Sequence, residues 1–140
     1  MPTAWPRYEA LAVFQEKDLL SLHEEAGRGL RRGKHRGTGI RIHAKVKRIV
    51  ADLHKAAEEE QDPVDIIATI FDDIERDPQP FTDCNHRTAL LLGRFVARAF
   101  GYNLKYSGPE GERLRLQWES MTRRTLRTWI TAHLVAFEGR

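Results

Sequence analysis

The sequence contains a single cysteine, Cys84, so no disulfide bond can form within the chain. Proteins that use no disulfides are typical of a reducing compartment, and we expect this one in the cytoplasm. The chain has no basic start followed by an apolar stretch, and no run of about 18 apolar residues that would predict a membrane span. These absences argue against a secreted or membrane protein.

Acidic residues are missing from one long stretch of the chain. Residues 27–51 hold no Asp or Glu, although nine Arg and Lys residues fall there, whereas residues 52–77 are rich in acids and hold only Lys55 and Arg76 as bases. The basic stretch suits an anion such as a phosphate or a nucleic acid. The two stretches are equally suited to neutralising each other across one surface. The charge pattern leaves both interpretations open.

The remaining patterns predict helices almost throughout. Apolar residues recur at three- and four-residue steps over residues 41–57, and again between the start signal Asp62-Pro63 and the stop signal Asp77-Pro78. Asp18 is expected to cap a helix that ends at Gly27. The 140 residues suffice for one core. We therefore predict a compact all-α bundle of about six helices in a single domain, residues 1–140.

Two regions interrupt this pattern. Residues 27–39, GRGLRRGKHRGTG, carry five glycines and predict a loop without a core pattern. Near the end, residues 103–106 suggest a short strand and Ser107-Gly108-Pro109 a turn. One or two closing helices are expected between Leu114 and Phe137.

The stretch QPFTDCNHRTAL, residues 79–90, carries the functional signal. Proline at 78 and 80 prevents helix, so a loop is expected that leads into a helix beginning near Arg87 or Thr88. The unpaired N–H groups at a helix N-terminus attract phosphates, and Arg87 can add a bidentate grip. Asp83 is an oxygen ligand suited to Mg²⁺. The loop therefore suggests a site for Mg²⁺ and a di- or triphosphate.

Each side chain of this loop also has a purely structural explanation. Asp83 can cap the next helix, Asn85 can serve a turn or orient a backbone group, and Arg87 can pair with a nearby acid. Phe81 stands between polar neighbours and is expected to anchor the loop by burial. Cys84 is either a small space-filler or a reactive thiol at a helix N-terminus.

The spacing Gln79-x-Phe81-x-Asp83-Cys84-Asn85-His86-Arg87-Thr88-Ala89 resembles the signature of the Fic/Doc (Fido) family, and within it the Doc (death-on-curing) branch. Leu90 stands where the adenylylating Fic branch has a second arginine. Flanking stretches are similar as well: residues 19–24 to the opening helix of Doc proteins, and Gly39, Ile40 and Arg41 to the end of their glycine-rich flap. The resemblance covers about residues 18 to 105.

The resemblance implies a small helical domain that binds ATP with Mg²⁺ and transfers a phosphoryl or nucleotidyl group to a protein hydroxyl. By position, Asp83 would hold the metal, whereas Asn85, His86 and Arg87 would bind the phosphates. The flap, residues 33–41, would align the target protein, which for Doc toxins is a translation factor. An antitoxin chain is a further implied partner.

Gln79 departs from the family, because the family has its general-base histidine at this position. A glutamine cannot remove a proton, and losing a general base costs about 10²–10⁴-fold in rate. Three explanations remain: a degenerate member that binds without efficient turnover, a substitute base such as His86 or His35, or a deliberate replacement that makes a toxic enzyme safe to produce. The expected function is therefore a nucleotide pocket with impaired catalysis.

The alternative to an enzyme is a non-catalytic binding module. Such a module would act as a partner in a toxin–antitoxin assembly, or bind nucleic acid through the basic residues 28–48. The chain lacks a helix-turn-helix or an RNA-binding signature, so nucleic acid ranks below a protein or nucleotide partner. The other histidines do not form a metal-ligand pattern, and a zinc site is not expected.

Overall fold

The computed structural model describes residues 7–28 and 39–137. Within these ranges the chain is mostly helical, which confirms the predicted all-α class. The elements, in chain order, are α1 (Arg7–Ala12), α2 (Glu16–Arg28), α3 (His43–Glu59), α4 (Pro63–Glu75), α5 (Asn85–Ala99), β1 (Tyr102–Leu104), α6 (Gly108–Leu116), the 3₁₀ turn η1 (Trp118–Ser120), α7 (Arg123–His133) and β2 (Leu134–Ala136).

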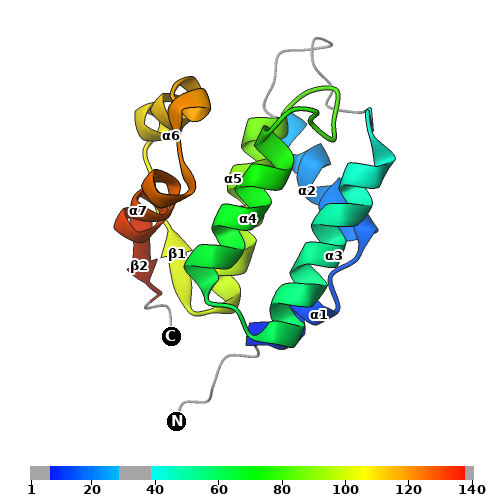
Figure 1. The fold of residues 1–140 in the computed structure, drawn as a ribbon, viewed down its shortest axis with the longest axis horizontal. Helices are drawn as coiled ribbons and strands as arrows, with labels where there is room; N and C mark the ends of the chain where they lie inside the picture. The colour runs from blue at the N-terminus through cyan, green and yellow to red at the C-terminus, as the bar shows by residue number, and fades with distance from the viewer. Residues whose placement is uncertain (1–6, 29–38, 138–140) are drawn as a thin grey trace.

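The helices α4 and α5 form the centre of the molecule (Figure 1). The first three helices lie on one side of this pair, and α6, α7 and the two-stranded sheet lie on the other. The sheet is antiparallel, with Tyr102 of β1 opposite Ala136 of β2. The loop from α4 to α5 lies at the end of the bundle where α2 ends and α3 begins. Segments far apart in the sequence therefore meet around this loop.

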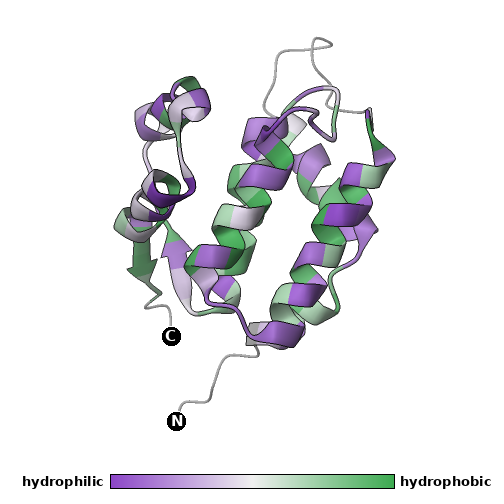
Figure 2. Ribbon diagram, viewed as in Figure 1, coloured by the Kyte–Doolittle hydropathy of each residue, from purple (hydrophilic) through white to green (hydrophobic). Residues whose placement is uncertain are grey.

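The core follows from the amphipathic pattern of each helix. The apolar steps expected in α3 and α4 are buried, and both hydrophilic and hydrophobic stripes run along the helices in Figure 2. Gly93 lets α4 and α5 approach closely: a Cβ there would lie 2.9 Å from Cε1 of Phe71 and 3.1 Å from Cδ2 of Leu104. A larger residue at this crossing would force the side chains of Phe71 and Leu104, or the helices themselves, to move.

Several element boundaries differ from the expected ones. Asp62 caps α4 as predicted, since its side chain accepts from the N–H of Val64 at 2.8 Å. The predicted Asp18 cap is wrong, because α2 already begins at Glu16 and the Asp18 carboxylate bonds back to the Gln15 N–H at 2.8 Å. The α5 helix begins at Asn85, two residues earlier than expected.

The C-terminal third also differs. Ser107 does not make a simple turn but opens α6 through a capping box with Glu110. The closing helical pattern ends at His133, after which residues 134–136 pair with β1 instead of continuing the helix. The short helix α1 was not expected at all, because six residues are too few to show a periodic pattern.

The charged stretches partly neutralise each other where they are described. Arg48 lies 3.9 Å from Asp52 of the acidic stretch, whereas Lys47 lies 3.3 Å from Glu16, which is outside that stretch. Residues 29–38, which include most of the expected flap and His35, lie outside the described residues. In the described ranges, no helix combines the length and the apolar character that crossing a membrane requires.

Candidate functional site

The motif loop is held against the chain segment that leads into α3. The N–H of Thr82 donates to the carbonyl of Gly39 at 3.0 Å, and that of Arg41 donates to Pro80 at 2.7 Å. Ile40 and Phe81 face each other as an isolated antiparallel bridge. A Cβ on Gly39 would meet Oγ1 of Thr82 at 2.5 Å. The end of the expected flap, residues 39–41, therefore lies directly beside the motif loop.

Phe81 and His23 join the loop to α2. Phe81 is fully buried, and the imidazole of His23 stacks on it with 3.7 Å between ring centroids and 9° between planes. Nε2 of His23 donates to the carbonyl of Asp83 at 3.0 Å. Burial lowers the pKa of His23, although the hydrogen bond to Asp83 and the charge of its carboxylate oppose this shift. His23 is therefore a neutral brace under the loop.

Asn85 ties the loop to the first turn of α5. Its Oδ1 accepts from the N–H of Phe81 at 3.1 Å, and its Nδ2 donates to the carbonyl of the same residue at 3.0 Å. Nδ2 also donates to Oε1 of Gln79 at 3.3 Å. The Asn85 side chain is buried and turned toward the loop backbone. Asn85 therefore orients the loop backbone, which is one of its two expected roles. Its expected contact with a phosphate remains a prediction.

Gln79, which the resemblance places where a base is expected, is bound at both ends of its amide. Its Nε2 donates to the carbonyl of Glu75 at 3.2 Å, while its Oε1 accepts from Asn85. The side chain thus links the last residue of α4 to the first residue of α5. A glutamine in this place fixes the loop, and it carries no group that could accept a proton from a hydroxyl.

His86 cross-links three helices. Its Nε2 lies 2.9 Å from the carbonyl of Gly111 in α6, and its Nδ1 contacts the carboxylate of Glu75 in α4. A carbonyl only accepts, so Nε2 donates to Gly111, while Nδ1 is held by the Glu75 carboxylate. Both side chains are largely buried. The ring is therefore engaged on both edges, which leaves neither nitrogen free for general-base work.

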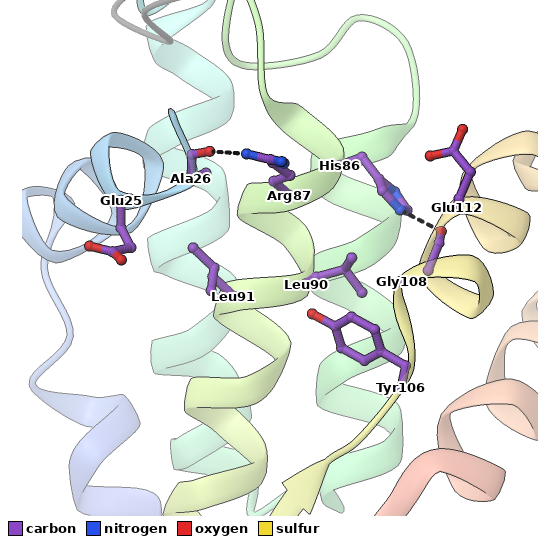
Figure 3. Close-up of a pocket in the computed structure, with 10 residues that line it drawn as sticks. Glu25, Ala26, His86, Arg87, Leu90, Leu91, Tyr106, Gly108 and Glu112 are labelled. Atoms are coloured by element: carbon purple, nitrogen blue, oxygen red, sulfur yellow. Dashed lines mark hydrogen bonds between the residues drawn. The ribbon is translucent and has the colours of Figure 1, made fainter. Parts of the chain in front are cut away.

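Arg87 extends toward the end of α2, on the opposite side of α5 from His86 (Figure 3). Its Nη1 donates to the carbonyl of Ala26 at 3.0 Å. This carbonyl belongs to the last turn of α2, where the helix dipole favours a cation. The side chain is otherwise exposed, and its other N–H groups have no acceptor among residues 7–28 and 39–137.

A pocket of ≈ 420 Å³ opens at the N-terminus of α5. Its wall combines residues 82–87 of the motif with Glu75 and Gln79, and α6 adds Glu112 and Arg115. The N–H groups of the first three residues of α5 donate to no other described residue, and no side chain caps this helix. Bare amides, a carboxylate at Asp83 and the side chain of Arg87, whose guanidinium is bonded to Ala26, therefore line one cavity.

A second hollow of ≈ 380 Å³ adjoins this pocket and shares His86, Arg87 and Glu112 with it. Its floor is apolar and is built by Leu90 and Leu91 of α5, with Tyr106 at the side (Figure 3). Together the two spaces form a polar end at the helix N-terminus and an apolar continuation along α5.

The remaining chemistry of the pocket is modest. Burial raises the pKa of the Cys84 thiol, and the Asp83 carboxylate adds to this, although Arg87 opposes it. A thiol of raised pKa stays protonated at neutral pH, which favours the space-filler interpretation of Cys84 over a reactive thiol. Among the described residues, no group of three or more His, Cys, Asp or Glu side chains is placed to hold a metal ion. A single carboxylate such as Asp83 together with phosphate oxygens is still a donor set that Mg²⁺ accepts.

Sequence reasoning missed several residues of the site. Glu75 follows Phe71 by four residues, and His23 follows Leu19 by four, so each lies on the buried face of its helix. A charged or polar residue on an apolar helix face is the sequence signal that could have identified Glu75 and His23. For Glu112 and Arg115 there was no signal, because only the packing of α6 brings them to the pocket.

Comparison of the chain with protein-family models, with curated proteins and with solved structures returned no match.

Proposed function

We propose that this chain is a Doc-like Fido-domain protein that binds Mg²⁺ and ATP through its phosphates at the N-terminus of α5, with impaired group transfer. The observation that carries the proposal is the ≈ 420 Å³ pocket, into which the motif loop and the first turn of α5 bring uncapped amides. Such a helix end, with an arginine beside it, suits phosphate oxygens.

The donor set of this pocket fits the proposed ligand. The amides of residues 85–87 and the guanidinium group of Arg87 supply hydrogen bonds and positive charge, and Arg115 adds a charge that is paired with Glu112. The Asp83 carboxylate supplies the oxygen that a divalent cation requires. Glu75 and Glu112 also line the pocket, so a bare polyphosphate would meet repulsion that Mg²⁺ relieves. The adjoining apolar hollow along Leu90, Leu91 and Tyr106 offers room for the rest of a nucleotide.

Catalysis is the weak part of this site. Gln79 holds the place of the base and cannot take a proton from an attacking hydroxyl. The imidazole of His86 is engaged by Glu75 and Gly111, so it is a poor substitute. Phosphoryl transfer depends mostly on positioning and on charge neutralisation, so slow transfer to a protein hydroxyl is compatible with the remaining residues.

Calorimetric titration with ATP and Mg²⁺ tests the binding part. Arg87→Ala is expected to weaken binding roughly 10- to 100-fold, since it removes charged hydrogen bonds to phosphate. Arg124→Ala is the matched control, because this exposed arginine of α7 has no acid partner in the described part of the chain. Absence of heat at millimolar nucleotide contradicts the proposal, and so does equal binding by Arg87→Ala.

Restoring the base tests the catalytic part. We expect expression of Gln79→His to arrest bacterial growth, whereas the original chain does not, because a restored base raises transfer about 10²–10⁴-fold. The double variant Gln79→His with Arg87→Ala should grow normally if the arrest depends on the pocket. Growth arrest by the original chain would show that Gln79 does not impair it.

The alternative, a non-catalytic module that binds nucleic acid through residues 28–48, has less support. The described bases of this stretch that pair with acids include His43, Lys47 and Arg48, so part of its charge is already used within the molecule. Binding that falls steeply with salt would favour nucleic acid.

A further inference from the structure

Three cationic side chains surround a separate cavity near the other end of α5. Arg94 and Arg98 lie one turn apart on this helix, and Asn103 and Lys105 face them from β1 and the residue after it. The cavity measures ≈ 340 Å³, and the fifth residue of its wall, Leu104, is buried. Arg94 and Arg98 lie seven and eleven positions after Arg87, which places them about 10 and 16 Å along the helix from it.

The charges of this cavity are not neutralised by acids. No carboxylate in residues 7–28 and 39–137 lies within 4.0 Å of the charged groups of Arg94, Arg98 or Lys105. Elsewhere the arginines that pair with acids are numerous: Arg28, Arg48, Arg76, Arg115, Arg123 and Arg127. Three bases without such a partner, gathered on one cavity, give it a positive potential that attracts anions.

Aromatic rings hold both guanidinium groups in place. Cζ of Arg94 lies 4.5 Å from the ring centroid of Tyr106, and Cζ of Arg98 lies 4.5 Å from that of Phe137. A guanidinium that stacks through its face keeps the N–H groups of its edge for acceptors. Because the stacked side chains are already restricted, less conformational entropy is lost when a ligand binds. The two arginines therefore resemble a prepared clamp more than freely moving surface charges.

We propose that this cavity is a second anion site, which binds a phosphate group between Arg94, Arg98 and Lys105. Arginine side chains bind phosphate oxygens in pairs, the Lys105 ammonium adds a point charge, and the Asn103 amide adds a donor. Both a small phosphate compound and the backbone of a nucleic acid present this group. The site does not depend on the proposed function, since none of its residues belongs to the motif pocket.

The test is a ¹H–¹⁵N NMR titration of the whole chain with inorganic phosphate. The backbone signals of residues 103–105 and the Nε–H signals of Arg94 and Arg98 should shift together and saturate at millimolar phosphate. The double variant Arg94→Gln with Arg98→Gln should lower the affinity at least about tenfold, because two charged hydrogen-bonding groups are lost. Arg124→Gln removes one charge elsewhere and should change the affinity less than about twofold. Lys105→Gln provides a milder variant should the double substitution disturb the fold.

The outcomes distinguish a nucleic-acid backbone from a small phosphate compound as the ligand, and they include results that contradict the proposal. If a single-stranded thymidine oligonucleotide displaces phosphate with a steep salt dependence, the site serves a nucleic-acid backbone. If it does not displace phosphate, the site serves a small phosphate compound. Shifts confined to residues 83–87, shifts spread over exposed arginines without saturation, or equal weakening by Arg124→Gln would overturn the proposal.

Discussion

Asp73 is a buried acid whose removal should stabilise the protein. The side chain lies between α3 and α4 with Asp52, Arg48 and Lys45 around it. Its Oδ2 is buried and has no hydrogen-bond partner in the described ranges. Burial first, and then the neighbouring carboxylate of Asp52, raise the pKa of Asp73 from its ordinary value of 3.8 to about 8, against the opposing charges of Arg48 and Lys45. The folded protein therefore holds this proton at neutral pH.

The sign of the resulting pH dependence follows from proton counting. As the pH rises above 3.8, the unfolded chain releases the proton, while the folded chain keeps it until about pH 8. The folded state binds more protons in this window, so the free energy of unfolding falls by up to about 1.4 kcal/mol per pH unit. The stabilising contribution is complete below pH 3.8 and is lost as the pH rises through about 8.

Asp73→Asn removes this proton equilibrium. We expect the variant to exceed the original protein in the free energy of unfolding by on the order of 1–3 kcal/mol at pH 8, and to show little difference near pH 4. Thermal unfolding followed by circular dichroism should show a rise in Tm of roughly 3–5 °C per kcal/mol for a chain of this size.

A neighbouring residue supplies the control. Asp72→Asn removes the same charge from the exposed side of α4, where Asp72 pairs with Arg76 at 2.8 Å and Arg123 at 4.0 Å. This variant should lose up to about 1 kcal/mol rather than gain stability. A stability difference for Asp73→Asn that does not vary with pH, or a loss of stability at pH 8, would refute the reasoning.

Three further substitutions probe the core and the motif loop. Gly93→Ala places a Cβ against Phe71, and this overpacking should lower the free energy of unfolding by about 1–3 kcal/mol. The higher helix propensity of alanine offsets up to about 1 kcal/mol of this loss. Urea unfolding measures the net change, and unchanged stability would mean that α4 and α5 shift freely. Asn85→Ala leaves the buried N–H and carbonyl of Phe81 without their side-chain partner, so amide exchange at Phe81 should accelerate, and unchanged protection would contradict the bracing role. Because the pKa of His23 is lowered in the folded state, the original protein should lose stability as the pH falls below about 6.5, and His23→Leu should not show this loss. Parallel profiles of the two proteins would count against a neutral His23.

The sequence allowed good prediction where one physical rule acts locally. The apolar periods of α3 and α4 and the Asp62-Pro63 start depend on residues within a few turns, and both were correct. The Asp18 prediction failed because an acid near a helix start can be the N-cap, or can lie three residues later and accept from the N–H of the N-cap residue, as Asp18 does from Gln15. The strand at residues 134–136 exists only because β1 lies beside it, and no local rule reports that neighbour.

The candidate site shows the same division. The motif predicted a loop followed by a helix N-terminus, and the structure brings Gln79, Phe81, Asp83, Asn85 and Arg87 around that helix end. The partners of these residues come from distant segments. Arg87 bonds to Ala26, and His86 bonds to Glu75 and Gly111. Tertiary packing brings these partners together, and the sequence pattern does not predict it.

The motif loop owes its shape to side chains from two helices and to the backbone of residues 39–42. It has no regular structure of its own, and a loop without such bonds would sample many conformations at a cost of about 1–2 kcal/mol per ordered residue on ligand binding. His23 of α2 supports it from below, Asn85 of α5 holds its centre, and residues 39–42 pair with its backbone. These contacts place polar atoms on otherwise apolar helix faces. Burying polar atoms does not stabilise the core more than apolar side chains would. If the proposed nucleotide site is correct, His23→Leu should therefore weaken nucleotide binding, although His23 lines neither hollow of the site.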